Sequence, residues 1–269
     1  MKLRTCFLFV FLCSTSLVFS QRKSSEHKVN NIQGVAVGSA SQTPEEVKQK
    51  AINNAKVNAL KSAGIEENIS SYSDYFRSES DNTMEDLFTS DILSNINGTI
   101  KDINISHQLF EIDNEGNIKC NLTINCSVIK YKTKKDLAFD AWVDGIKMLY
   151  NAGDGLTFTI KPTKDCFIRA FVFTDKSYVL LPNAYEHSKK LLAQNKYTFP
   201  DPKIMDPYEL TLESEKKDKE LNRLVLVFLK EDIYYTGKIN YKDITSWIMS
   251  IPPDDRIIKY YSYAIYKTQ

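Results

Sequence analysis

The sequence predicts an α+β protein in which an N-terminal helix-on-sheet domain is followed by a mainly β, sandwich-like domain. Three patterns predict this fold class. A strand with two glycines runs into a helix with alanines at the helical period, two long stretches then alternate with a period of two, and the second half carries short apolar runs between turn residues. We expect a signal peptide at 1–20, a linker at 21–28, the first domain at 29–133 and the second at 134–269.

The N-terminal segment has the three parts of a secretory signal peptide. Lys2 and Arg4 precede the apolar run Cys6–Phe19, and the small residue Ser20 stands before Gln21 at the expected cleavage point. About 14 apolar residues at 1.5 Å per residue reach only ~21 Å, short of the ~30 Å hydrocarbon core of a bilayer. We therefore expect an exported protein, periplasmic or extracellular, with no integral membrane span in the mature chain.

A lipid anchor on Cys13 is the alternative to free release. Leu12 stands immediately before that cysteine, where lipoprotein processing requires a small residue. Any peripheral attachment of the mature protein to the envelope is therefore expected to come from its folded domains.

Charge and histidine content exclude several classes of function. Without residues 1–20 the chain has 33 basic and 34 acidic residues, a balance that gives no electrostatic footprint for nucleic acid. Its three histidines, His27, His107 and His187, show no metal-ligand spacing, and no nucleophile elbow, phosphate loop or dinucleotide fingerprint is present. We expect no catalytic residue, no metal and no cofactor.

The first domain opens with a strand, Ile32–Ala40, and a helix. Thr43 is the expected N-cap, Pro44 takes the first helical position and Glu46 completes a capping box, while Gly64 ends the helix. The side chains expected to face a sheet are mostly alanines, which indicates close packing: Val47, Ala51, Ala55, Ala59 and Ala63.

A second helix and a hairpin complete this domain. The apolar spacing in Thr83–Asn95 predicts the helix. Ile100–Ile112 and Asn117–Lys130 then alternate with a period of two around the turn Asp113–Gly116, and this pattern predicts two long antiparallel strands.

These features make the first domain similar to a known family. The glycine strand Gly34–Ala40, the alanine run with Ala63-Gly64-Ile65, and the hairpin resemble the N-terminal domain of flagellar assembly protein T and of the lipoprotein-20 family of bacterial envelope proteins. The resemblance implies an envelope-associated, non-enzymatic role for the first domain.

The second domain reads as short strands with one late helix. Asn151–Gly155 is the expected turn after the first strand, and Lys242–Ser250 is a helix with Ile244, Trp247 and Ile248 facing inwards before Pro252 and Pro253 end it. The expected strands are Leu137–Asp144, Leu156–Ile160, Phe167–Phe173, Tyr178–Leu181, Leu224–Leu229 and Tyr260–Tyr266.

This half resembles a bacterial family, domain of unknown function 4384. The residues that carry the resemblance are Gly155–Phe158, Asp165–Ile168, Phe171–Phe173, the Leu-Pro-Asn step in Val179–Asn183, and Tyr197–Pro200. The family is a β-sandwich found beside varied partner domains, which implies a binding or structural module. Gln194-Asn195 stands where that family usually carries a glycine, so this turn departs from the pattern.

We therefore expect a non-enzymatic binding or assembly module of the bacterial envelope, with a protein or glycan partner. The candidate binding residues are the tyrosines of the last strand, since ring faces bury large areas at low entropic cost: Tyr260, Tyr261, Tyr263 and Tyr266. The alternative is an exported hydrolase with a carboxylate-based site, for which Asp201, Asp206 and Glu209 are candidates.

Cys120, Cys126 and Cys166 are expected to be buried small residues. Cys120 and Cys126 would lie too far apart along a straight strand to form a disulfide with each other.

Overall fold

The computed structural model describes residues 24–39, 41–65, 73, 96–214 and 216–268. The expected signal peptide, its cleavage point between Ser20 and Gln21, and the expected helix Thr83–Asn95 lie outside these residues. Among the described residues, no helix is both long and apolar enough to cross a membrane.

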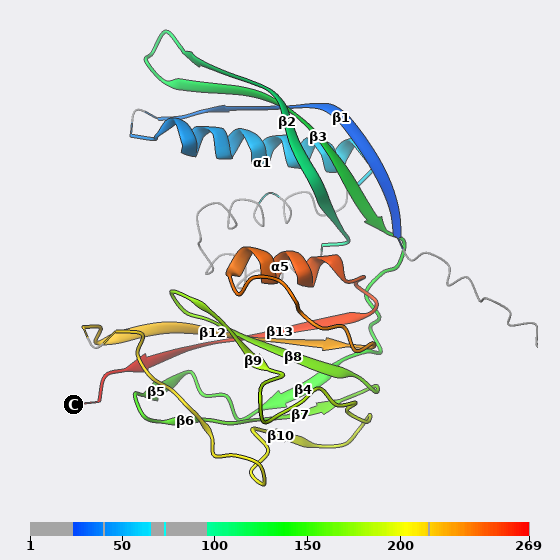
Figure 1. The fold of residues 1–269 in the computed structure, drawn as a ribbon, viewed down its shortest axis with the longest axis vertical. Coiled ribbons are helices and arrows are strands. Elements are labelled where there is room, and N and C mark those ends of the chain that lie inside the picture. The colour runs from blue at the N-terminus through cyan, green and yellow to red at the C-terminus, as the bar shows by residue number, and fades with distance from the viewer. Residues whose placement is uncertain (1–23, 40, 66–72, 74–95, 215, 269) are drawn as a thin grey trace, which may run out of the picture.

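Two sheets enclose the helices of the described chain (Figure 1). The first sheet has the order β1-β3-β2 and contains β1 (Ser24–Val37), β2 (Gly98–Ile112) and β3 (Ile118–Tyr131), all antiparallel. Helix α1 (Pro44–Ser62) packs on β1 and β3, and helix α5 (Tyr241–Ser250) lies between α1 and the second sheet. The expected hairpin and the late helix are thus confirmed.

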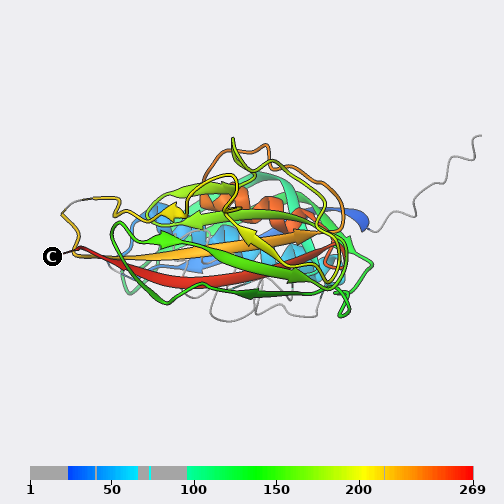
Figure 2. The same cartoon turned by 90° about the horizontal axis from the view of Figure 1, so that it is seen from below.

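The second sheet has five strands and carries a smaller sheet on its far side (Figures 1 and 2). Its order is β5 (Leu149–Asn151), β13 (Arg256–Tyr266), β12 (Lys219–Leu229), β8 (Phe167–Phe173) and β9 (Ser177–Leu181). Below it lie a three-stranded sheet, β10 (Tyr197–Phe199), β7 (Phe158–Pro162) and β4 (Ala141–Asp144), and the pair β11 (Tyr208–Glu209) and β6 (Gly155–Leu156). The predicted fold class, α+β with a sandwich-like second half, is confirmed.

Helix α1 begins and packs as its sequence predicts. The Thr43 side chain accepts from the Glu46 N–H at 3.3 Å, and the Glu46 carboxylate accepts from the Thr43 N–H at 2.6 Å, which completes the capping box. A Cβ at Gly34 would lie 2.1 Å from the Ala51 carbonyl oxygen, so only glycine allows the helix this close to β1. Gly64 follows the helix with φ +73°.

The five-stranded sheet is buried on both faces. On β12 the side chains alternate between two cores: Leu224 and Phe228 face the smaller sheets, whereas Val225 and Val227 join α1, α5 and the first sheet. The helices therefore share one continuous core with both sheets. The division into domains at 29–133 and 134–269 stays a prediction.

Several strand limits differ from those expected because pairing partners extend or shorten them. β1 starts at Ser24, inside the expected linker 21–28, since Ser24–Val29 pair with β3. β12 and β13 are longer than expected because they pair with each other over their whole length. The expected strand Leu137–Asp144 is reduced to β4, Ala141–Asp144, which pairs with β7, and Leu137 is exposed.

Candidate functional site

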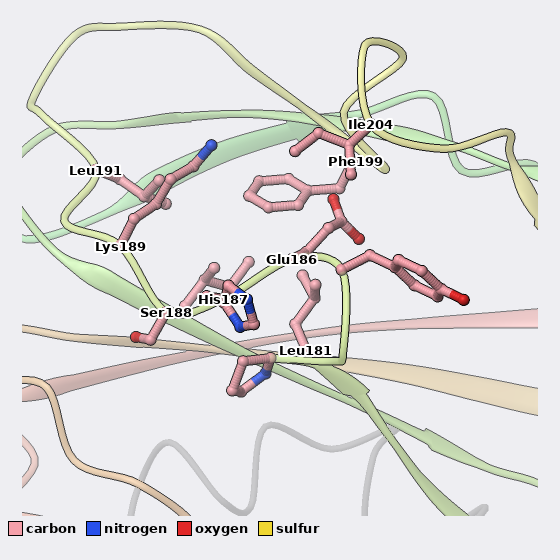
Figure 3. Close-up of a pocket in the computed structure, with 11 residues that line it drawn as sticks. Leu181, Glu186, His187, Ser188, Lys189, Leu191, Phe199 and Ile204 are labelled. Carbon is pink, nitrogen blue, oxygen red and sulfur yellow. The ribbon is translucent and has the colours of Figure 1, made fainter.

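A cavity of about 220 Å³ opens where β9 ends, between the five-stranded sheet and the loop that follows it (Figure 3). Leu181, at the end of β9, and Pro182, the next residue, line it on one side, and Phe199 lines it from β10. Its lining is mostly apolar: Ile168, Leu181, Pro182, Tyr185, Glu186, His187, Ser188, Lys189, Leu191, Phe199 and Ile204.

Glu186 is the centre of the hydrogen bonds that shape this cavity. Its residue is only 6% exposed, and its carboxylate accepts from the Asp201 N–H at 3.0 Å, from Asn183 Nδ2 at 3.2 Å and from the Tyr208 hydroxyl. Burial, together with the bond to Glu186, raises the pKa of Tyr208 well above its usual value. One carboxylate thereby joins the loop after β9, the loop after β10 and strand β11.

Asn183 fixes the turn that presents Glu186. Its Oδ1 accepts from the N–H groups of Tyr185 and Glu186 at 2.9 and 2.8 Å, and its own N–H donates to the Glu186 carbonyl at 3.1 Å. This is a side-chain-stabilised turn, for which asparagine is well suited. The Leu181–Pro182 and Phe199–Pro200 peptide bonds next to the cavity are both cis. The Leu-Pro-Asn step and the Tyr197–Pro200 segment therefore meet in space.

The inner wall is packed, and the exposed lining residues are both apolar and polar. Phe199 stacks on Phe158 with ring centroids 5.6 Å apart, and the Cys166 and Leu191 backbones pair at the base of the loop. At the mouth, Tyr185 is 68% exposed and Ile204 is 50% exposed. The exposed side chains of His187 and Lys189 also line the cavity, so an incoming apolar group would meet apolar side chains inside it and a mixed apolar and polar rim.

Ser188 is held by an ion pair in which the arginine is buried and the aspartate is partly exposed. Arg169, fully buried, contacts Asp232 Oδ1 at 2.5 Å, donates to Ser188 Oγ at 2.9 Å, and lies 4.6 Å from the centre of the Tyr234 ring. Ser188 Oγ in turn donates to Asp232 at 2.7 Å. Within the described residues Ser188 Oγ is hydrogen-bonded to Arg169 and Asp232, and no hydrogen bond joins it to His187.

The candidate tyrosines of β13 do not form one surface. Tyr263 is 3% exposed and packs edge-to-face on Tyr150 at 5.5 Å, and burial raises its pKa. Tyr260 packs against the core that contains the helices and Tyr261 against the opposite core, while Tyr266 is the exposed one.

The carboxylates considered for hydrolysis do not line the cavity either. Asp201 Oδ1 accepts from the Lys203 N–H at 3.0 Å within its own turn, and Asp206 and Glu209 are exposed. Cys120, Cys126 and Cys166 are buried, as expected, and all three are free thiols. In the described part of the chain, no three His, Cys, Asp or Glu side chains are grouped to hold a metal ion.

Sequence reasoning missed Glu186, Tyr208 and Arg169. Glu186 stands three residues after Asn183, a spacing that could have suggested a turn contact. Arg169 is a lone charge inside the apolar run Phe167–Phe173, and a lone charge in a buried strand requires a partner.

Comparison with known families gives a match in the part of the chain that contains the cavity. Residues 149–219 match the family described as a domain of unknown function, DUF4384. Every residue that lines the cavity lies within these matched residues. The C-terminal resemblance is thereby supported, whereas the resemblance of the first domain stays a prediction.

Comparison with curated proteins and solved structures adds no function. No curated protein matches the chain. Among solved structures, a chain in the complex of zinc 2-glycoprotein (ZAG) with prolactin inducible protein (PIP) from human seminal plasma is 13% identical, with 51% of this chain and 99% of that chain covered and a TM-score of 0.24.

Proposed function

We propose that the protein is an exported, non-enzymatic binding module of the bacterial envelope, and that its cavity at Glu186 receives an apolar side chain of a partner protein. The observation that carries the proposal is the cavity itself: a small, mostly apolar hollow whose exposed lining residues are Tyr185 and Ile204 together with the polar His187 and Lys189. Sites of this kind, apolar with a few placed polar groups, are where proteins bind ligands.

The size of the cavity favours a side chain over a small-molecule substrate. Pockets for drug-sized ligands measure about 300–1,000 Å³, and this one measures about 220 Å³. Full burial of a leucine or phenylalanine side chain contributes about 1.5–3 kcal/mol. One such anchor, surrounded by the rim, suits a protein contact of moderate affinity.

The hydrogen bonds of Glu186 keep the cavity open in advance of binding. The contacts to Asn183, Asp201 and Tyr208 hold three separate segments in place. A site ordered beforehand loses less conformational entropy when a partner binds. We therefore assign Glu186 a positioning role and no direct part in chemistry.

The rival proposal, an exported hydrolase, needs two carboxylates on one cavity. Within the described residues Glu186 is the one carboxylate that lines it, and this carboxylate already accepts three hydrogen bonds. The binding role requires no second acid and is therefore preferred.

The test is a titration followed by NMR, with N-acetyl-phenylalaninamide, N-acetyl-leucinamide and the polar N-acetyl-glutaminamide as probes. We expect saturable shifts of the Leu191 and Phe199 amides with the two apolar probes and none with the polar one. Ile204→Glu places a charge at the mouth and should abolish these shifts. Ile239→Glu is the matched control, because Ile239 is also at least half exposed but does not line the cavity. Shifts that are absent, or equal in both variants, would contradict the proposal.

A further inference from the structure

Among the strands that the structure describes, β13 has a pairing partner along its whole length on one edge and only at its end on the other. β12 pairs with all of Arg256–Tyr266, whereas β5 pairs only with Ala264–Tyr266. Nowhere in the described ranges does a strand pair with the other edge of residues 256–263. Figure 2 shows β13, in red, along one side of the molecule.

The direction of the backbone groups follows from one hydrogen bond. The Ala264 N–H donates to the Met148 carbonyl at 2.9 Å, on the β5 side. Backbone groups alternate between the two edges of a strand, so Ser262 and Ile258 direct their N–H and C=O groups to this same side. Such a row is a template for a further strand.

This edge lacks two of the features by which proteins protect exposed strands, a β-bulge and a proline. β12 and β13 pair without a register shift, and β13 contains no proline. By contrast β2, an edge strand of the first sheet, shifts register between Lys101 and Asn104 and again between Ile105 and His107. Bulges of that kind twist an edge away from flat pairing. Of these two long strands, β13 is the better template.

A hollow of about 330 Å³ lies beside the open part of β13. The segment before β4 forms its second wall, and there Leu137 is 87% exposed. The hollow includes two of the candidate tyrosines, and its lining is Lys135, Leu137, Phe139, Asp140, Ile257, Ile258, Lys259, Tyr260 and Tyr261.

The charges of the hollow indicate what it would accept. Lys259 Nζ lies 2.9 Å from Asp140 Oδ1, so these two charges are paired. Lys135 makes no ion pair with any residue that the structure describes. Two lysines against one aspartate give the hollow a net positive charge, which suits an acidic side chain near Lys135.

We propose that the open edge of β13 docks an extended segment of a partner protein as an added strand, with an apolar side chain on Leu137 and an acidic side chain towards Lys135. Main-chain hydrogen bonds to Ile258 and Ser262 supply the affinity, and the hollow supplies the selectivity. This site is separate from the cavity at Glu186, and the proposal for it does not depend on the function proposed for that cavity.

The probe is the blocked peptide acetyl-Thr-Val-Glu-Val-Thr-Val-amide, titrated into the purified protein. We expect saturable NMR shifts of the Ile258 and Ser262 amides. A peptide with lysine in place of glutamate should bind less well. Lys135→Gln should weaken the glutamate peptide about threefold to fivefold, the effect of one exposed ion pair, whereas Lys134→Gln, a neighbouring lysine outside the hollow, should not. Equal effects of the two variants would overturn the acidic preference.

Strand addition itself is tested by changing the peptide and leaving the protein unchanged. The result therefore does not depend on whether a protein variant folds. The peptide is N-methylated on one alternate set of amides or on the other, because only one set can face β13. We expect one methylated peptide to keep its affinity and the other to lose binding. Equal affinity of both, shifts confined to other strands, or no saturation at millimolar peptide would overturn the proposal. The apolar amide probes of the cavity report separately on the proposed function.

Discussion

Arg256 Nη2 donates a hydrogen bond to the Ile96 carbonyl oxygen at 3.1 Å, and so joins β13 to the residue pair that precedes β2. The same guanidinium donates from Nη1 to the carbonyls of Ile248, at 2.6 Å, and Ile251 at the end of α5. A cation at a helix C-terminus satisfies carbonyls that have no partner within the helix. Tyr131 adds a second link, since its hydroxyl donates to the Met249 carbonyl at 2.7 Å.

The first prediction concerns this junction. Arg256→Met keeps the bulk of the buried side chain but removes every donor, so three buried carbonyls lose a partner. We expect the free energy of unfolding to fall by about 2–4 kcal/mol, measured by urea denaturation. Lys242→Met, on the exposed side of α5, is the control and should change it by less than about 0.5 kcal/mol. Equal losses in the two variants would show that the junction is not held by Arg256.

The second prediction concerns the packing of α1 on β1. A Cβ at Gly34 would meet the Ala51 carbonyl oxygen and, at 2.7 Å, the Ala55 Cβ. Gly34→Ala should therefore lower the free energy of unfolding by about 1–3 kcal/mol through overpacking. Val35→Ala in the same strand, where the side chain is exposed, should have a much smaller effect. A Gly34→Ala protein as stable as the parent in thermal denaturation would contradict the close approach.

The third prediction concerns acid stability. Hydrogen bonds from Tyr178, Lys176 and Thr174 lower the pKa of Glu213 from 4.5 to about 2. Because the folded-state pKa is depressed, this carboxylate stabilises the fold above its unfolded pKa, and the contribution is lost as pH falls from about 4.5 to about 2. Glu213→Gln should therefore be less stable than the parent at neutral pH, with the difference shrinking in that window. A difference in unfolding free energy that is constant with pH would refute this.

The fourth prediction concerns export. Lys2, Arg4 and the apolar run Cys6–Phe19 predict cleavage after Ser20. The protein recovered outside the cytoplasm should begin at Gln21 when its N-terminus is sequenced. Leu12→Ala places a small residue before Cys13, and only this variant should gain a lipid label. A parent protein that starts at Met1, or one that is itself lipid-labelled, would contradict the prediction.

Local signals carried most of the fold that could be predicted. The capping box of Thr43 and Glu46 and the turn at Asp113, whose Oδ1 accepts from the Asn117 N–H at 2.8 Å, depend on neighbours a few residues away. The start of β1 at Ser24 could not be predicted in this way, because its partner Tyr131 lies far along the chain. Strand limits follow the pairing partner as much as the strand's own sequence.

The candidate site was predictable only in part, for the same reason. The Leu-Pro-Asn step at Leu181–Asn183 marked the right segment. Glu186, however, acquires its role from Asp201 and Tyr208, which are 15 and 22 residues away, and Arg169 from Asp232, 63 residues away. Carboxylates and arginines are common, and no spacing in the sequence shows which of them converge. The tyrosines of β13 suggested a binding surface because they are close together in the sequence. Successive side chains of a strand face opposite sides of the sheet, however, so these tyrosines are divided between two cores.

The most direct test of the account is where an apolar side chain binds. Intermolecular nuclear Overhauser effects should be measured between the ring of N-acetyl-phenylalaninamide and the methyl groups of the protein. We expect contacts from the ring to Leu181, Leu191 and Ile204, which line the cavity at Glu186. Contacts to other methyl groups without these three, or none at saturating probe, would contradict it.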